Sequence, residues 1–186
     1  MLLALAAVIY AVGLLILRTT SSKLILFVWG ASGFALLAIW IAVDLNVHYL
    51  LATLEARQLQ WMLNLSGNPI EVVNHVTLLV PDRQGWVGMT IGAESSTLIE
   101  LSVFVGIMLF YPKLSGNRRL MYGVIGVMGT YLLNLVRLLL IIALVSMWGR
   151  DVFPLAHSVV GRILYFLGVV ALYWYLLTNP TLRIIH

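Results

Sequence analysis

The sequence predicts an all-α membrane protein with about five transmembrane helices and a small extracellular insertion, a helix plus a β-hairpin, between helices two and three. Of its 186 residues, 62% are apolar and only 10% are charged, whereas a soluble domain has roughly 45–50% apolar and about 25% charged residues. Its mean hydropathy of +1.03 cannot be hidden in a core, because a folded chain of this size still exposes about a third of its surface. These values exclude a soluble globular domain and a disordered chain, and the absence of Cys excludes a disulfide scaffold.

Five apolar runs mark the predicted spans, because a helix needs about 20 residues to cross the hydrocarbon core of a bilayer. In chain order they are Met1–Leu17, Leu24–Val43, Ser95–Pro112, Leu120–Gly149 and Ile163–Leu182. The last run can begin earlier, near Pro154. The first run lacks a basic start and a small-residue cleavage site, so we expect it to be retained rather than removed as a signal peptide.

Basic residues predict the orientation, since short loops rich in Lys and Arg stay in the cytoplasm. The connections after spans one and three and the segment after span five are short and basic, with Arg18, Lys23, Lys113, Arg118, Arg119 and Arg183. The other side also carries most of the acidic residues. We therefore expect a multi-pass protein of the cell membrane with its amino terminus outside and its carboxyl terminus inside. This pattern accounts for the net charge of +4, so no nucleic-acid partner is expected.

Residues 1–186 are predicted to form a single membrane domain in which residues 44–94 are the extracellular insertion. His48–Leu65 has polar residues at helical spacing opposite an apolar face, which predicts a helix in the outer interface. A continuation of span two beyond the membrane is the alternative. Val76–Val80 and Trp86–Ile91 flank the turn sequence Pro81–Gly85, which predicts a β-hairpin that returns the chain to the membrane.

Arg137 is the most deeply placed charge, about 18 Å from the end of its span at 1.5 Å per residue. Such a charge costs roughly 2.5–3.5 kcal/mol to insert and is usually functional. Asn134 lies three residues before Arg137, on the same helical face. The alternative is structural, with Arg137 only pairing with Glu100 of span three to hold two spans together.

His157 lies near the predicted start of the last span, where Pro154 suits the first helical turn. The positive end of a helix favours a neutral imidazole, which can act as a base; a simple hydrogen-bonding role is the alternative. The remaining histidines, His48, His75 and His186, have no comparable setting. The four do not have the spacing of metal ligands, so no metal site is expected.

A third polar cluster, Glu94–Glu100, lies where span three begins and contains Ser95, Ser96 and Thr97. Taken alone, these residue types are ordinary helix caps. The predicted topology, however, places the cluster, Arg137 and His157 toward the outer half of three consecutive spans. A hydroxyl, a base and a fixed cation within reach of one another are the components of acyl-transfer chemistry.

In order and spacing these residues resemble the exosortase/archaeosortase family of membrane cysteine proteases and transpeptidases. The family pattern has a Cys at the outer start of one span, Asn-x-x-Arg in the next span and a His opening the one after. Asn134–Arg137 and Ala156–Ser158 match the last two parts. The first part resembles the Glu-Cys-Ser-Gly-x-x-Glu form of small Gram-positive relatives, with matches at Glu94, Ser96 and Glu100 and with Thr97 in place of Gly. The resemblance covers about residues 44–175.

The resemblance implies an enzyme that processes the carboxy-terminal sorting signals of exported proteins near the outer leaflet, without a cofactor. Its substrate would carry a short recognition motif, a transmembrane helix and a basic tail. Residue 95 would be the nucleophile, His157 the general base and then acid, and Arg137 the cation that stabilises the thiolate or the oxyanion. Asn134, Glu94 and Glu100 would have supporting roles.

The chain departs from the family at the nucleophile position, where Ser95 stands in place of Cys. Either Ser95 replaces a native Cys or this member lacks the thiol by nature. A serine hydroxyl stays protonated and needs a better-aligned base than a thiol with a pKa near 8.5, so we expect substrate binding with poor turnover. The rival hypothesis is a non-catalytic membrane component of a surface-polysaccharide or protein export system. A small transporter would have inverted repeats or broken helices, which the sequence lacks.

Overall fold

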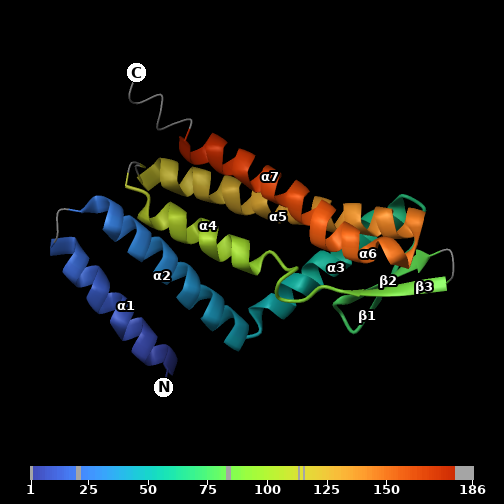
Figure 1. Ribbon diagram of the computed structural model, residues 1–186, viewed down its shortest axis with the longest axis horizontal. Helices are drawn as coiled ribbons and strands as arrows, with labels where there is room; N and C mark the ends of the chain where they lie inside the picture. Colours follow the sequence, from blue (N-terminus) through green and yellow to red (C-terminus); the bar gives the residue numbers. More distant parts are fainter. Residues whose placement is uncertain (1, 20–21, 83–84, 113, 115, 179–186) are drawn as a thin grey trace.

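The computed structural model describes residues 2–19, 22–82, 85–112, 114 and 116–178, and it is mostly helical (Figure 1). The helices are α1 (Leu2–Thr19), α2 (Lys23–Asp44), α3 (Val47–Leu65), α4 (Leu98–Phe110), α5 (Gly116–Trp148), α6 (Phe153–Leu155) and α7 (Gly161–Tyr173). A 3₁₀ turn, η1 (Arg150–Val152), precedes α6, and π-helical turns η2 (Ala156–Val160) and η3 (Trp174–Thr178) flank α7. The strands are β1 (Glu71–Val73), β2 (Thr77–Asp82) and β3 (Gly85–Thr90).

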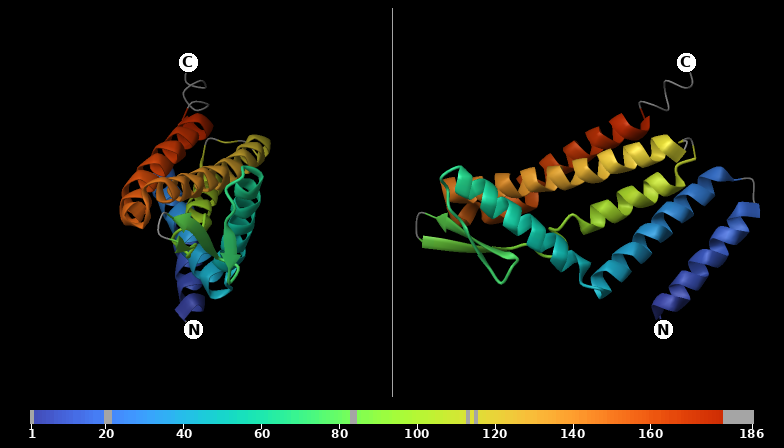
Figure 2. Two further views of the ribbon diagram at one scale, coloured as in Figure 1. Left: turned by 90° about the vertical axis from the view of Figure 1, so that its right-hand side faces the viewer. Right: turned by 180° about the vertical axis from the view of Figure 1, so that it is seen from behind.

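Four helical segments of the described chain are long and apolar enough to cross a membrane: α1, α2, α5 and the run Arg150–Thr178. They confirm the predicted membrane class, and the last run begins near Pro154, as the sequence allowed. Together with α4 they lie in a row, in the order α1, α2, α4, α5 and α7 (Figures 1 and 2). The predicted end of span five at Leu182, the basic residues Lys113 and Arg183, and His186 lie outside the described residues.

Helix α4 is shorter than the predicted third span, with 13 residues. At its start, the N–H groups of Ser95 and Ser96 donate to the carbonyl of Gly92, so these residues form a turn before the helix. At its end, Tyr111 is extended, with φ −64° and ψ 117°, because a residue that precedes proline avoids the helical conformation. Pro112 therefore ends α4.

Helix α3 is a separate helix, so the unbroken continuation of span two is wrong. Asn46 adopts the left-handed conformation, with φ 56°, and the chain bends sharply there between α2 and α3 (Figure 1). The large apolar residues Leu50, Leu54 and Trp61 are exposed on one side of α3. The other side packs on the sheet and on α5.

The predicted hairpin is confirmed as β2 and β3, and β1 adds a third antiparallel strand in the order β1-β2-β3. Leu78 pairs with Met89 and Val80 with Val87, so alternate side chains share one face, of which Leu78, Val80 and Met89 are buried. This face packs on α3 and the second half of α5 in one core that contains Ala56, Leu59, Leu138, Ile141 and Val145. We call α3, the sheet, α6 and α5 from Leu135 onward the head.

Helix α5 joins the membrane bundle to the head. Its 33 residues extend for about 50 Å at 1.5 Å per residue, against a hydrocarbon core of about 30 Å. In the bundle it approaches α4 closely at Gly126, where a Cβ atom would lie 1.8 Å from the ring of Phe104. In the head its side chains form much of the core, which explains why so long an apolar run exceeds one span.

Candidate active site

Ser95 lies in the turn that connects β3 to α4, where the head meets the bundle (Figure 1). The backbone N–H groups of Ser95 and Ser96 donate to the carbonyl oxygen of Gly92 at 3.0 and 2.8 Å. Ser95 is 9% exposed, and its hydroxyl forms no hydrogen bond with any described residue. The backbone of residue 95 is thus fixed by a hydrogen bond, whereas its side chain has none within the described residues.

Asn134 of α5 fixes this turn from the neighbouring helix. Its side-chain amide donates to the carbonyl oxygen of Ser95 at 2.9 Å and to a carboxyl oxygen of Glu55 at 3.0 Å. Asn134 is 1% exposed, and these two bonds use both hydrogens of its amide. Its amide donors therefore serve to position other groups.

Glu55 of α3, which the sequence pattern did not single out, belongs to the same cluster. Its Oε1 accepts hydrogen bonds from the N–H and the hydroxyl of Thr97 as well as from Asn134. Burial raises the pKa of its carboxyl. The available signal was its place at helical spacing from Ala52, Ala56 and Leu59, on what is now the buried face of α3.

The hydroxyl cluster does not cap α4. Thr97 forms no side-chain capping bond, since its hydroxyl donates to Glu55, and the Ser96 hydroxyl donates to the carbonyl of Ala93 at 3.0 Å. The ordinary explanation of these residues as caps is therefore wrong. Thr97 instead ties the start of α4 to α3.

Arg137 is almost completely buried, with 5% of its surface exposed. Its guanidinium carbon lies 5.6 Å from the centre of the Tyr165 ring, within the range of a cation–π contact. Glu100 attracts it electrostatically, and Glu55 does so more weakly, but no ion pair forms between Arg137 and Glu100 in the described chain. The purely structural alternative, an Arg137–Glu100 salt bridge, is thus not formed.

His157 lies in the π-helical turn η2 and is partly exposed. Its ring stacks on Phe153, with centroids 5.5 Å apart, and it interacts electrostatically with Arg137, Arg162 and Glu94. No hydrogen bond joins it to Ser95, although the structure describes both residues. π-Helical turns are rare and often occur at functional sites.

Arg137 and three residues that interact with it, Glu55, Glu100 and Tyr165, each have a buried side-chain polar atom without a hydrogen-bond partner in the described chain. For Arg137 the atom is Nε, and for Glu55 and Glu100 it is Oε2. Buried polar groups are normally paired. A group of unpaired ones on α3, α4, α5 and α7 therefore has the polarity to receive a polar ligand.

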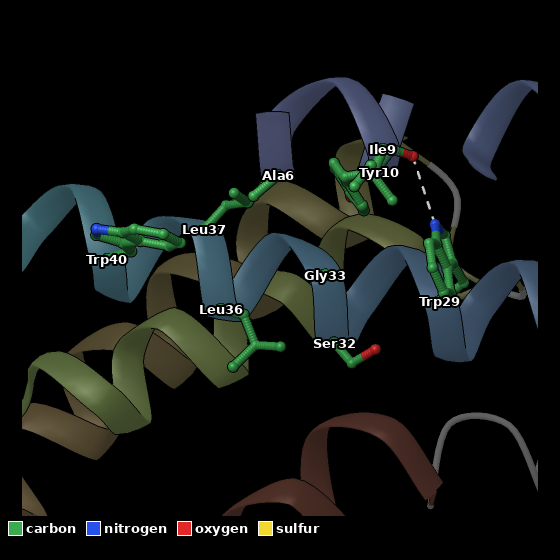
Figure 3. Close-up of a pocket in the computed structure, with 9 residues that line it drawn as sticks. All are labelled: Ala6, Ile9, Tyr10, Trp29, Ser32, Gly33, Leu36, Leu37 and Trp40. Atoms are coloured by element: carbon green, nitrogen blue, oxygen red, sulfur yellow. Dashed lines mark hydrogen bonds between the residues drawn. The ribbon is translucent and has the colours of Figure 1, made fainter. Parts of the chain in front are cut away.

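An apolar groove with a volume of about 500 Å³ lies elsewhere, between α1 and α2 (Figure 3). Ala6, Ile9, Leu36, Leu37 and Trp40 line it, and the Trp29 indole bonds to the carbonyl of Tyr10 at 3.4 Å on its border. It contains none of the predicted site residues.

The structure therefore links Ser95 to Glu55 through Asn134 and buries Arg137 beside the ring of Tyr165. The family model of the transmembrane exosortase, Exosortase_EpsH, matches residues 1–175. The chain belongs to the exosortase family. This family comprises membrane transpeptidases, and this exosortase is accordingly a multi-pass membrane protein. No curated protein and no solved structure matches the chain.

Proposed function

We propose that this exosortase is built to process the carboxy-terminal sorting signals of exported proteins, with residue 95 as its nucleophile position. The observation that supports this is the distribution of donors around Ser95. The N–H groups of Ser95 and Ser96 bond to Gly92, and that of Thr97 bonds to Glu55. These three backbone donors are therefore already engaged, whereas Nε of Arg137, on the same helix as Asn134, is buried and has no partner in the described chain.

In the proposed reaction the side chain of residue 95 attacks the peptide carbonyl carbon, and His157 takes its proton. Negative charge then develops on the carbonyl oxygen, where Arg137 would stabilise it; a fixed cation in a site without bulk water is effective in this role. The C–N bond breaks as His157 returns the proton to the leaving amine. The acyl group on residue 95 is then released by water or by an acceptor nucleophile.

In the proposed arrangement the remaining residues support these three. Asn134 holds the carbonyl of Ser95, Glu100 attracts Arg137 and Glu94 attracts His157. The missing bond between His157 and Ser95 is consistent with a base that aligns only in the substrate complex, since catalytic hydrogen bonds are often long without substrate. With Ser at position 95, the hydroxyl lacks the readily formed thiolate of a Cys, so turnover is slow.

The site would face the outer leaflet, with the head outside the cell, as the basic loops indicate. A substrate anchored by its own transmembrane helix would approach from the bilayer and present its recognition motif to the turn at residue 95. The proposed substrate class, a protein with a recognition motif, a transmembrane helix and a basic tail, is inferred from the family. The proposed reaction uses no cofactor.

Trapping a covalent adduct tests the proposal. The Ser95→Cys variant is incubated with a candidate sorting-signal polypeptide, and the adduct is detected by mass spectrometry beside the Ser95 chain. We expect an acyl adduct on residue 95 of the variant and slow or no turnover by the Ser95 chain. Equal cleavage by the two chains would contradict the role of residue 95.

The absence of Cys favours one rival, a non-catalytic membrane component of a polysaccharide or protein export system. The native gene separates the two. A Cys codon at position 95 supports the enzyme, and a Ser codon together with an unreactive Ser95→Cys variant supports the non-catalytic component.

A further inference from the structure

Glu55 has a feature that the proposed reaction does not use: it is a completely buried acid on a helix outside the membrane spans. We propose that Glu55 is a positioning residue, which holds residue 95 against α5 by accepting hydrogen bonds from both Thr97 and Asn134. This inference rests on the proposed function, because it concerns how the nucleophile position is held. It assigns to α3 a direct part in the geometry of the site.

The contacts support this role because they connect three elements through one oxygen atom. Oε1 of Glu55 accepts from the N–H of Thr97 at 3.2 Å and from the amide of Asn134 at 3.0 Å. Thr97 lies two residues after Ser95, and the same Asn134 amide donates to the carbonyl of Ser95. The turn is thus bonded to α3 through Thr97 and to α5 through the carbonyl of Ser95.

Deleting the carboxyl would leave three donors near residue 95 without their acceptor. Buried donors find new partners at the expense of local geometry, and the turn from Gly92 to Thr97 is the segment that can move. The alignment of residue 95 with Arg137 and His157 that the proposed reaction requires would then be lost. An amide at position 55 keeps an acceptor oxygen and would preserve the arrangement.

A thiol at residue 95 gives a readout that does not depend on substrate. In the Ser95→Cys background, the rate of iodoacetamide alkylation is measured against pH for Glu55→Ala, Glu55→Gln and Thr97→Val, with the exposed α3 variant Arg57→Ala as control. A cationic surrounding lowers the pKa of a thiol and raises its reactivity at neutral pH. All rates are measured below the melting transition of each variant.

We expect Glu55→Ala to slow alkylation at pH 7 by at least about fivefold and to move the thiol pKa toward its ordinary value. Glu55→Gln should remain within about twofold of the single variant, and Thr97→Val should fall between the two. The direction of the change in alkylation rate distinguishes two effects. If Glu55 acted only through its negative charge, its removal would lower the thiol pKa and speed alkylation. A decrease therefore reports displacement of the turn.

The proposal would be overturned if Glu55→Ala lowered the melting temperature but left the alkylation rate equal to that of Ser95→Cys alone. Glu55 would then have only a role in stability. If Glu55→Ala does not fold, an unchanged rate in Thr97→Val or a fivefold loss in Glu55→Gln would overturn the proposal. Failure of the proposed function is separate, because the Ser95→Cys variant would then form no peptide adduct at residue 95, whatever residue occupies position 55.

Discussion

The side-chain amide of Asn134 donates to the backbone carbonyl of Ser95 across 2.9 Å, from the middle of α5 to the turn that opens α4. The two residues are 39 positions apart in the chain and come from two parts of the family motif. The Asn of the Asn-x-x-Arg pattern is thereby connected to the proposed nucleophile position through the backbone. This contact does not depend on which side chain stands at residue 95.

Replacing Asn134 by Ala should therefore destabilise the protein. The substitution leaves the Ser95 carbonyl without its donor and removes one of the donors to Glu55, at a cost of about 1–3 kcal/mol. A lower midpoint of thermal unfolding in detergent would be the measurement, with exposed Asn117→Ala of the same helix as control. Equal midpoints for both variants would contradict the prediction.

Replacing Arg137 by Lys in the Ser95→Cys background should slow processing by about 10²–10³-fold, the usual cost of losing one oxyanion donor. Lysine keeps the charge but lacks the planar fork of donors that includes Nε. The measurement is the rate of substrate cleavage, with exposed Arg118→Lys as control. Retained processing in a folded Arg137→Lys variant would remove Arg137 from the mechanism.

Replacing Gly126 by Ala should loosen the packing of α4 on α5, because the added Cβ would lie 1.8 Å from the Phe104 ring. Overpacking of this kind costs about 1–3 kcal/mol. Gly123→Ala on the same helix is the control, since a Cβ there meets nothing within 4 Å. The midpoint of thermal unfolding should be lower for Gly126→Ala than for Gly123→Ala. Adding Phe104→Leu to Gly126→Ala should partly restore that midpoint.

Glu55 should contribute a fall in the unfolding midpoint as the pH rises, because its carboxyl has a different pKa in the folded and the unfolded state. Burial raises the pKa of this carboxyl in the folded state, so the folded state holds a proton that the unfolded state has lost. The contribution is complete below the unfolded pKa and is lost as the pH rises through the folded pKa. Glu55→Gln should flatten the fall in unfolding midpoint across this range, while exposed Glu71→Gln should not.

The orientation can be tested because the chain contains no Cys, so single thiols can be introduced on either side. Glu71→Cys in β1 should react with a membrane-impermeant maleimide in intact cells. Asn117→Cys at the start of α5 should react only after the membrane is opened. The reverse pattern would mean that the head lies in the cytoplasm.

Composition and apolar runs sufficed to predict the membrane class and its helices, and the turn sequence between two strand-like segments predicted the β2–β3 hairpin. The prediction overestimated α4, because the bonds of Ser95 and Ser96 to Gly92 form a turn before the helix and Pro112 ends it. Helix α5 begins four residues before its predicted start and ends one residue before its predicted end. The prediction missed β1, whose three residues are too few for a periodic pattern. Such elements depend on tertiary contacts that no local window contains.

For the site, charge inside apolar runs and the ordered motif led to Ser95, Asn134, Arg137 and His157. The roles of these residues remain predictions, although the structure brings Asn134 to Ser95 and buries Arg137. Glu55 was not identified, although it lies at helical spacing from Ala52, Ala56 and Leu59, because that spacing alone does not tell whether the acid meets solvent or a neighbouring helix. Only the fold reveals that its side of α3 faces inward.

Helix α5 passes without interruption from the membrane bundle into the head, and this has a consequence for substrate choice. Because α5 is one continuous helix, it would hold Asn134, and through the Asn134–Ser95 hydrogen bond also residue 95, at a fixed height relative to the bilayer. For a substrate anchored in the same membrane, the number of residues between its own anchor and the bond to be cut would then act as a measured length. Lengthening that spacer by a few residues should move the bond out of reach, even if every residue of the recognition motif is kept.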